Sequence, residues 1–196
     1  PEKMSRLMLS AKTATLTAMA TISRLSSIRI LSREFDWRVN PKEPGPPQLF
    51  IYFVEGEREK TGDRPGLFVA PMPDRAAHLA VDPTYWLEAY RRLTTTTTSQ
   101  DTDQLWRTTK SPYPPVKMAT LTAWIRKAMK LGGVNTAVFR PHSIRSASAK
   151  REQGRNTSMD TVLSRGGWKV DGNGHSATFA RYYNKPVLIA QYVPLG

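Results

Sequence analysis

Two side chains in the C-terminal half have types and spacing suited to binding a phosphate. His142 and Arg145 lie three residues apart in a stretch that we expect to be helical, so both project from one face. A guanidinium offers a planar fork of hydrogen-bond donors, and an imidazole adds a further donor. The pair therefore predicts a phosphate site. The alternative is a buried or helix-capping His142 beside an Arg145 that forms a surface ion pair.

Two adjacent tyrosines follow on another predicted helix. The phenols of Tyr182 and Tyr183 can serve as nucleophiles if nearby cations make their ionisation easier. Neighbouring residues on a helix point about 100° apart, so only one of the two can face a site shared with His142 and Arg145. These residues predict nucleophilic attack on a phosphate and leave the choice of tyrosine open.

Five ordered elements of the chain resemble the catalytic signature of the tyrosine recombinases, the phage-integrase family. That signature has an early arginine, a lysine on a β-hairpin, His-x-x-Arg, Gly followed by His or Trp, and a tyrosine. The matching segments are Ser23-Arg24-Leu25-Ser26, Lys60-Thr61, His142-Ser143-Ile144-Arg145, Gly167-Trp168 and Thr178-Phe179-Ala180-Arg181-Tyr182-Tyr183. The last segment is similar to the T-F-x-x-x-Y form of mobile-element recombinases of the DIRS, Ngaro and Crypton kinds.

The resemblance implies site-specific cleavage and rejoining of DNA strands through a 3′-phosphotyrosyl intermediate. It makes Tyr183 the nucleophile, because this residue falls five positions after Thr178. The residues that it assigns to the remaining roles are Arg24, His142 and Arg145 for the phosphate charge, Trp168 for support of their pocket, and Lys60 as general acid. The implied reaction uses no metal ion and no cofactor, and it takes place on a homo-oligomer, a tetramer, bound to double-stranded DNA.

Some features depart from the family pattern. Ser27 stands near the place where family members carry an acidic residue after the first arginine. Residues 169–175 resemble an insertion that lengthens the step from Trp168 to the tyrosines, which keeps Tyr182 as the alternative nucleophile. In a second alignment, His175 takes the place of Trp168 as the residue of the Gly-His/Trp element.

The composition is that of a basic protein without cysteine. The 196 residues carry 29 Lys and Arg against 16 Asp and Glu, a formal net charge of +13, so the expected partner is a polyanion such as nucleic acid. The absence of cysteine excludes disulfide scaffolds and thiolate zinc sites. No apolar run approaches the roughly 18 residues of a membrane-spanning helix, and no signal peptide is evident. We therefore expect an intracellular protein, nuclear if eukaryotic, with no membrane partner.

A β-hairpin is predicted in the first half of the chain. Residues 49–54 are aromatic and β-branched, and residues 67–70 form a second short apolar run. The charged turn between them holds Lys60, with Arg58 and Arg64 as alternatives to it.

Outside the hairpin, the pattern predicts helices. Apolar residues recur at helical spacing through residues 1–35, whereas the proline-rich residues 40–48 must form a connection. Asp82 is expected to cap a helix that starts at Pro83, and an amphipathic helix should end at Gly132.

Three shorter helices should follow. The first runs from His142 to Gln153, the second is capped by Ser158 or Asp160, and the third follows Ser176.

Together these patterns predict an α+β fold that is mainly α. The resemblance adds the tyrosine-recombinase catalytic domain, with a small antiparallel sheet on one side, as a single domain over residues 1–196. An upstream core-binding domain, usual in the family, is not expected within this chain. Two alternative functions remain: a catalytically inactive DNA-binding module derived from a recombinase, and a basic RNA-binding protein with coincidental motifs.

Overall fold

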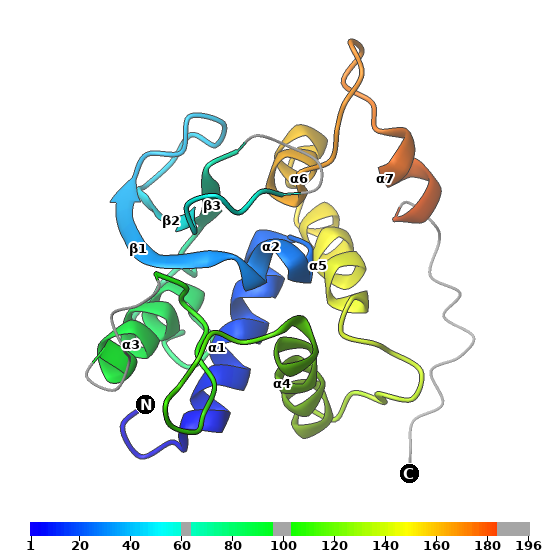
Figure 1. The fold of residues 1–196 in the computed structure, drawn as a ribbon. Coiled ribbons are helices and arrows are strands. Elements are labelled where there is room, and N and C mark those ends of the chain that lie inside the picture. The colour runs from blue at the N-terminus through cyan, green and yellow to red at the C-terminus, as the bar shows by residue number, and fades with distance from the viewer. Residues whose placement is uncertain (60–63, 96–102, 184–196) are drawn as a thin grey trace.

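The computed structural model describes residues 1–59, 64–95 and 103–183, which form a mainly helical α+β fold (Figure 1). This confirms the predicted fold class and the small antiparallel sheet. In chain order the elements are α1 (Arg6–Thr21), α2 (Leu25–Arg29), β1 (Leu31–Arg38), β2 (Gln48–Phe53), β3 (Gly66–Val69), α3 (Pro83–Thr95), α4 (Met118–Leu131), α5 (Ser143–Gly154), α6 (Met159–Gly166) and α7 (Ala177–Tyr182).

The sheet has the strand order β1-β2-β3, and both pairs are antiparallel. β2 and β3 are the predicted hairpin. The helix predicted through residue 35 is wrong, because the chain enters β1 at Leu31. Leu31 and Phe35 are both buried, and a spacing of four residues fits the buried face of a strand as well as that of a helix. The periodicity alone therefore could not separate the two.

Side-chain caps set the starts of three helices where the sequence predicts them. The Asp82 carboxylate accepts a 2.6 Å hydrogen bond from the Tyr85 amide at the start of α3. Ser158 and Ser176 cap α6 and α7 in the same way. Each cap satisfies an amide that the first turn of a helix leaves without a partner.

The buried apolar residues form two clusters. The larger lies between the sheet and the helices α1, α3 and α4. The smaller joins α5, α6 and α7 and consists of Ile22, Ala149, Val162, Leu163, Trp168 and Phe179. Ile22 ends α1 in the left-handed conformation, with φ 53°, and this turn directs the chain toward α2. The second cluster is the one that carries the candidate site.

Candidate active site around Arg145

Arg145 lies in the first turn of α5 and is only 5% exposed. Its Nη2 donates a 2.9 Å hydrogen bond to the carbonyl of Gly166. Nε and Nη1 are buried without a hydrogen-bond partner in the part of the chain that the structure describes. Burial lowers the pKa of Arg145 to about 10, a shift that Tyr183 opposes and that the charges of Arg24 and Arg64 reinforce. Buried donors without acceptors make this guanidinium ready to bind an anion.

Trp168 forms a wall of the space around Arg145. A Cβ on Gly166 would lie 1.8 Å from the indole, so the tryptophan packs directly on the last residue of α6. Gly167 adopts the left-handed conformation, with φ 63°, and turns the chain back. The indole centre then lies 4.0 Å from Cζ of Arg145, a cation–π contact. Its Nε1 is buried and has no partner among the described residues.

Tyr183 closes the same space from the end of α7. Its ring centre lies 5.3 Å from Cζ of Arg145 and 4.8 Å from the ring of Trp168. Phe179, one turn earlier, packs edge-on against Trp168 at 4.9 Å and fixes α7 against the end of α6. The structure thus brings a candidate nucleophile, a cation and an indole together.

Arg24 approaches this space from the N-terminal half of the chain. It follows the left-handed turn at Ile22, occupies the N-cap position of α2 and is half-buried. Its charge lowers the pKa of Arg145 and contributes to lowering that of Glu59. Arg24 is therefore within electrostatic reach of both side chains.

Glu59 and Arg64, from the connection between β2 and β3, also belong to this cluster. The Glu59 side chain is 2% exposed and accepts hydrogen bonds from Arg64 and from the Ser27 hydroxyl. From the sequence, Arg64 is predicted only as an alternative to Lys60, and Glu59 is given no role. No local signal could have identified Glu59, because its partner Ser27 lies 32 residues earlier.

The other predicted site residues are exposed or lie outside the described residues. His142 occupies the N-cap position of α5, and its side chain is exposed. His175 is exposed on the loop between α6 and α7, which projects away from the body of the protein (Figure 1). Lys60 and the side chain of Tyr182 lie outside the part that the structure describes.

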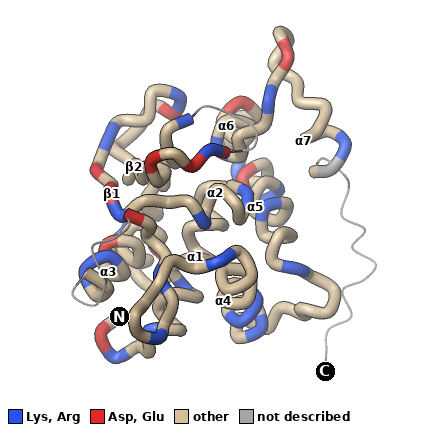
Figure 2. Tube along the Cα trace, in the orientation of Figure 1, with Lys and Arg blue, Asp and Glu red and all other residues tan. Residues whose placement is uncertain are grey.

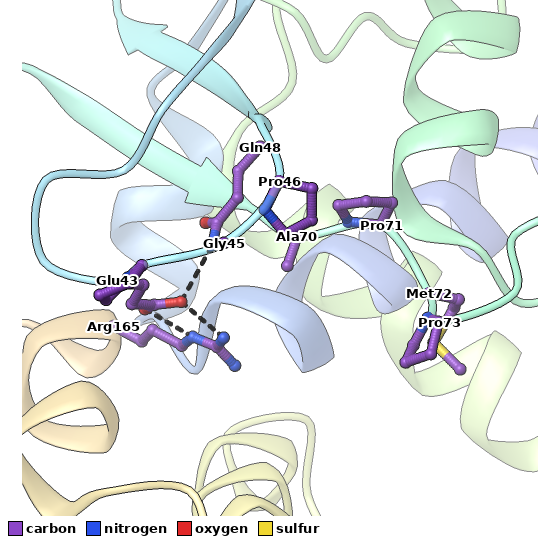
Figure 3. Close-up of a pocket in the computed structure, with 10 residues that line it drawn as sticks. Glu43, Gly45, Pro46, Gln48, Ala70, Pro71, Met72, Pro73 and Arg165 are labelled. Carbon is purple, nitrogen blue, oxygen red and sulfur yellow. Dashed lines mark hydrogen bonds and ion pairs between the residues drawn. The ribbon is translucent and has the colours of Figure 1, made fainter.

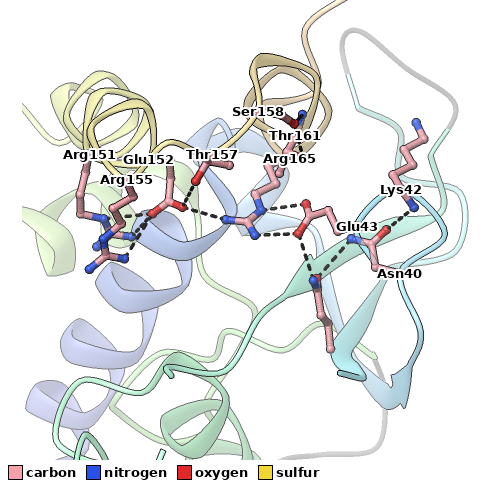
Figure 4. A network of polar contacts seen from close by, with 11 residues as sticks. Asn40, Lys42, Glu43, Arg151, Glu152, Arg155, Thr157, Ser158, Thr161 and Arg165 are labelled. Atoms are coloured by element: carbon pink, nitrogen blue, oxygen red, sulfur yellow. Dashed lines mark hydrogen bonds and ion pairs between the residues drawn. The ribbon is translucent and has the colours of Figure 1, made fainter. Parts of the chain in front are cut away.

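A second cluster of charged residues lies next to the site and consists of ion pairs (Figure 4). Arg165 binds both oxygens of Glu43, at 2.8 and 2.6 Å, and Glu152 at 3.1 Å. Glu152 also pairs with Arg151 and Arg155. Burial lowers the pKa of Arg165, but the hydrogen bonds and charges of the two carboxylates outweigh it, so the pKa is raised. These contacts join the β1–β2 connection to α5 and α6.

A cavity of about 350 Å³ opens beside this network (Figure 3). Glu43, Gln48 and Arg165 line part of it, and several prolines, including Pro46 and Pro71, line the rest. The residues predicted to act on a phosphate are not among those that line it. We therefore assign the cavity no part in the candidate site.

The described helices include none long and apolar enough to cross a membrane. The described residues also hold no group of three or more His, Asp and Glu side chains placed to bind a metal ion.

No protein-family model and no curated protein matches the chain. Among solved structures, it is similar to the FLP recombinase in its complex with a Holliday junction, with a TM-score of 0.55 and 16% sequence identity. The similarity covers 94% of this chain and 43% of the FLP chain, so this chain spans less than half of that protein. The protein therefore has a fold similar to that of a tyrosine recombinase.

Proposed function

We propose that the protein cleaves and rejoins DNA strands through a covalent phosphotyrosyl intermediate, with Tyr183 as nucleophile. The observation that carries this proposal is the buried guanidinium of Arg145, which packs against Trp168 and Tyr183. Two of its nitrogen atoms, Nε and Nη1, have no acceptor among the described residues. A scissile phosphate would supply those acceptors and place phosphorus next to the phenol. The fold similarity to FLP recombinase supports the same function.

In the proposed cleavage step, the phenol of Tyr183 gives its proton to water and Oη forms a bond to the scissile phosphorus. The bond from phosphorus to O5′ breaks, and O5′ leaves with a proton that the resemblance assigns to Lys60. Arg145 and Arg24 stabilise the charge on the non-bridging oxygens at the pentacoordinate stage, and the exposed His142 adds a donor from the surface side. Rejoining reverses these steps, because the 3′-phosphotyrosyl bond conserves the energy of the phosphodiester.

The distribution of charge supports DNA as the substrate. The sequence contains no Asp or Glu between Gln104 and Arg151. Basic residues recur along α4 (Figure 2), where Arg126, Lys127 and Lys130 are exposed. A surface of this kind binds phosphate backbones with an affinity that falls steeply as salt rises.

The assembly and origin of the protein follow from the resemblance to the recombinase family. The proposal includes a homotetramer on double-stranded DNA and a nuclear location if the host is eukaryotic. It also includes an origin in a mobile element, supported by the pattern from Thr178 to Tyr183.

Formation of a covalent protein–DNA adduct tests the proposed function. The probe is a pool of duplexes with a randomised segment that contains one 5′-bridging phosphorothiolate. Its sulfur leaving group needs no general acid and religates poorly, so adducts accumulate. We expect the wild type and Tyr182→Phe to form an adduct stable in denaturant, and Tyr183→Phe to form none.

Other outcomes of this assay would change the assignment. Loss of the adduct only in Tyr182→Phe would make Tyr182 the nucleophile. No adduct from wild type on DNA that it binds would favour the inactive DNA-binding module. Tighter binding to RNA than to duplex DNA, again without an adduct, would favour the RNA-binding alternative.

A further inference from the structure

The carboxylate of Glu59 lies where the charges of three arginines converge. Arg64 donates to both of its oxygens, with Nε 2.5 Å from Oε2 and Nη2 2.8 Å from Oε1. Burial raises the pKa of Glu59, but Arg64, the Ser27 hydroxyl and the charge of Arg24 together outweigh it and lower the pKa. The charge of Glu59 in turn favours the protonated form of Arg145. An ionised carboxylate therefore stands beside the proposed phosphate site.

Arg64 holds Glu59 in place and is itself fully engaged. Its Nη1 donates to the carbonyl of Arg165, at 3.1 Å, and its Nη2 to Oγ of Ser23, at 3.3 Å. A Cβ on Gly167 would lie 2.8 Å from Nη2 of Arg64, so a glycine is what allows this approach. Because its N–H groups donate hydrogen bonds to acceptors within the protein, Arg64 has a structural role. Arg145, in contrast, keeps buried donors without an acceptor among the described residues.

Ser27 links Glu59 to the helix that begins after Arg24. It is buried in α2, three residues after Arg24, and its hydroxyl donates to Oε1 of Glu59. Arg24 is the N-cap of α2 and Ser27 lies in its first turn, so a carboxylate at position 27 would lie at the same end of the helix as Arg24. The serine provides no charge at that place and instead binds the carboxylate of Glu59.

We propose that Glu59 is the carboxylate that positions Arg24 beside Arg145, supplied by the β2–β3 connection in place of an acidic residue on α2. The inference rests on the proposed function. Glu59 acts through Arg24 and touches no reacting atom, so it is a positioning residue. Arg64 and Ser27 hold Glu59 by hydrogen bonds at the end of α2 where Arg24 is the N-cap. Without the carboxylate, Arg24 keeps its charge but loses a negative charge that attracts its guanidinium, and a displaced donor stabilises the transition state poorly.

A cycle of substitutions in the full chain tests this role. Glu59→Gln keeps the shape of the side chain and removes its charge, and we expect it to slow single-turnover cleavage at saturating DNA by about 100-fold. DNA affinity should change little. Ser27→Asp alone places a second carboxylate against Glu59, so its thermal stability should fall. The double variant Ser27→Asp/Glu59→Gln moves the single carboxylate onto α2, and cleavage should recover about tenfold over Glu59→Gln.

Two comparisons make the cycle specific. Glu57→Gln is the matched control, because Glu57 lies in the same connection but pairs with Arg29 at the surface; we expect it to cleave as the wild type does. The defect of Glu59→Gln should also persist on the phosphorothiolate probe, whose sulfur needs no general acid. If the defect disappeared on this probe, Glu59 would act through the general acid Lys60 and not through Arg24. The inference would then be overturned.

The remaining outcomes separate this inference from the proposed function. Adduct formation by the wild type and equally by Glu59→Gln would overturn the inference and leave the function intact. A loss that the double variant does not recover, and that matches the unfolded fraction, would make Glu59 purely structural and also overturn it. Absence of any adduct from the wild type would overturn the proposed function, and the positioning role with it.

Discussion

Arg145 and Arg165 lie on neighbouring helices, and the protein surrounds their charges in opposite ways. Arg165 is bound by the carboxylates of Glu43 and Glu152, and its pKa is raised. Arg145 is more deeply buried, hydrogen-bonds to the carbonyl of Gly166, and has a pKa lowered to about 10. Arg165 is in direct contact with two carboxylates, whereas no carboxylate among the described residues forms an ion pair with Arg145.

This difference separates an arginine that stabilises the fold from one that is ready for a ligand. An arginine whose donors are taken by two carboxylates has little left to offer a substrate. A buried guanidinium with unpaired donors carries a desolvation penalty that a bound phosphate relieves. The second arrangement is not explained by stability, which favours a binding role for Arg145.

The largest effect on stability is expected from Arg165→Met. This substitution removes the cation that the buried carboxylates of Glu43 and Glu152 share, and the free energy of unfolding should fall by about 3 kcal/mol. Denaturant unfolding measures the change. The control Arg155→Met removes an exposed partner of Glu152 and should cost under about 1 kcal/mol. A loss of cleavage beyond the unfolded fraction would place Arg165 in the reaction and remove the contrast with Arg145.

Arg145→Lys is expected to slow cleavage on the order of 100- to 1000-fold, the range for loss of a preorganised donor at a developing oxyanion. A lysine keeps the charge but cannot present the planar fork of donors. Single-turnover cleavage of the phosphorothiolate probe gives the rate, with thermal unfolding as the check on folding. Cleavage at the wild-type rate would show that Arg145 does not contact the phosphate.

Gly166→Ala should disturb the packing of Trp168 against Arg145. The new Cβ would overlap the indole of Trp168, and we expect overpacking to lower the free energy of unfolding by about 1–3 kcal/mol. The displaced indole should also reduce cleavage. Gly154→Ala is the matched control, because a Cβ there meets nothing within 4 Å at the end of α5. Equal stability of the two variants would mean that Trp168 is free to move away from Arg145.

The smallest effect expected is a gain in stability from Arg145→Met, together with loss of cleavage. Replacing a poorly compensated buried cation with an apolar side chain should raise the free energy of unfolding by about 1 kcal/mol. Denaturant unfolding would then show opposite signs for the methionine variants at positions 145 and 165. A decrease in stability would show that the contacts of Arg145 with Gly166 and Trp168 outweigh its desolvation, and the comparison between the two arginines would fail.

The local parts of the fold could be predicted from the sequence. The caps Asp82, Ser158 and Ser176 depend on residues within three positions of each serine or aspartate, and the β2–β3 hairpin depends on its own composition. β1 could not be predicted, because the pairing of Leu31 with Phe53 comes from another strand. Local chemistry sets helix ends, whereas strand identity is decided by the partner.

The candidate site likewise combines residues that could be predicted from local motifs with contacts that are long-range. The motifs that hold Arg145, Trp168 and Tyr183 are short, and the resemblance selects those residues from the sequence alone. The contacts that surround them are long-range: Glu59 meets Ser27 across 32 residues, and Arg64 meets the carbonyl of Arg165 across 101. Nothing near Glu59 in the sequence distinguishes it from the other acidic residues of the same connection.

The composition of the smaller apolar cluster predicts which part of the protein unfolds locally. It ties α5, α6 and α7 together, and Ile22 is its only buried member from the N-terminal half of the described chain. Elements with few buried links to the rest of a protein tend to open as a separate cooperative unit. The backbone amides of α6 and α7 should therefore exchange hydrogen with solvent more readily than those of α1, which lines the larger cluster. We therefore expect Tyr183 to lie on a part of the molecule that opens locally while the main body stays folded.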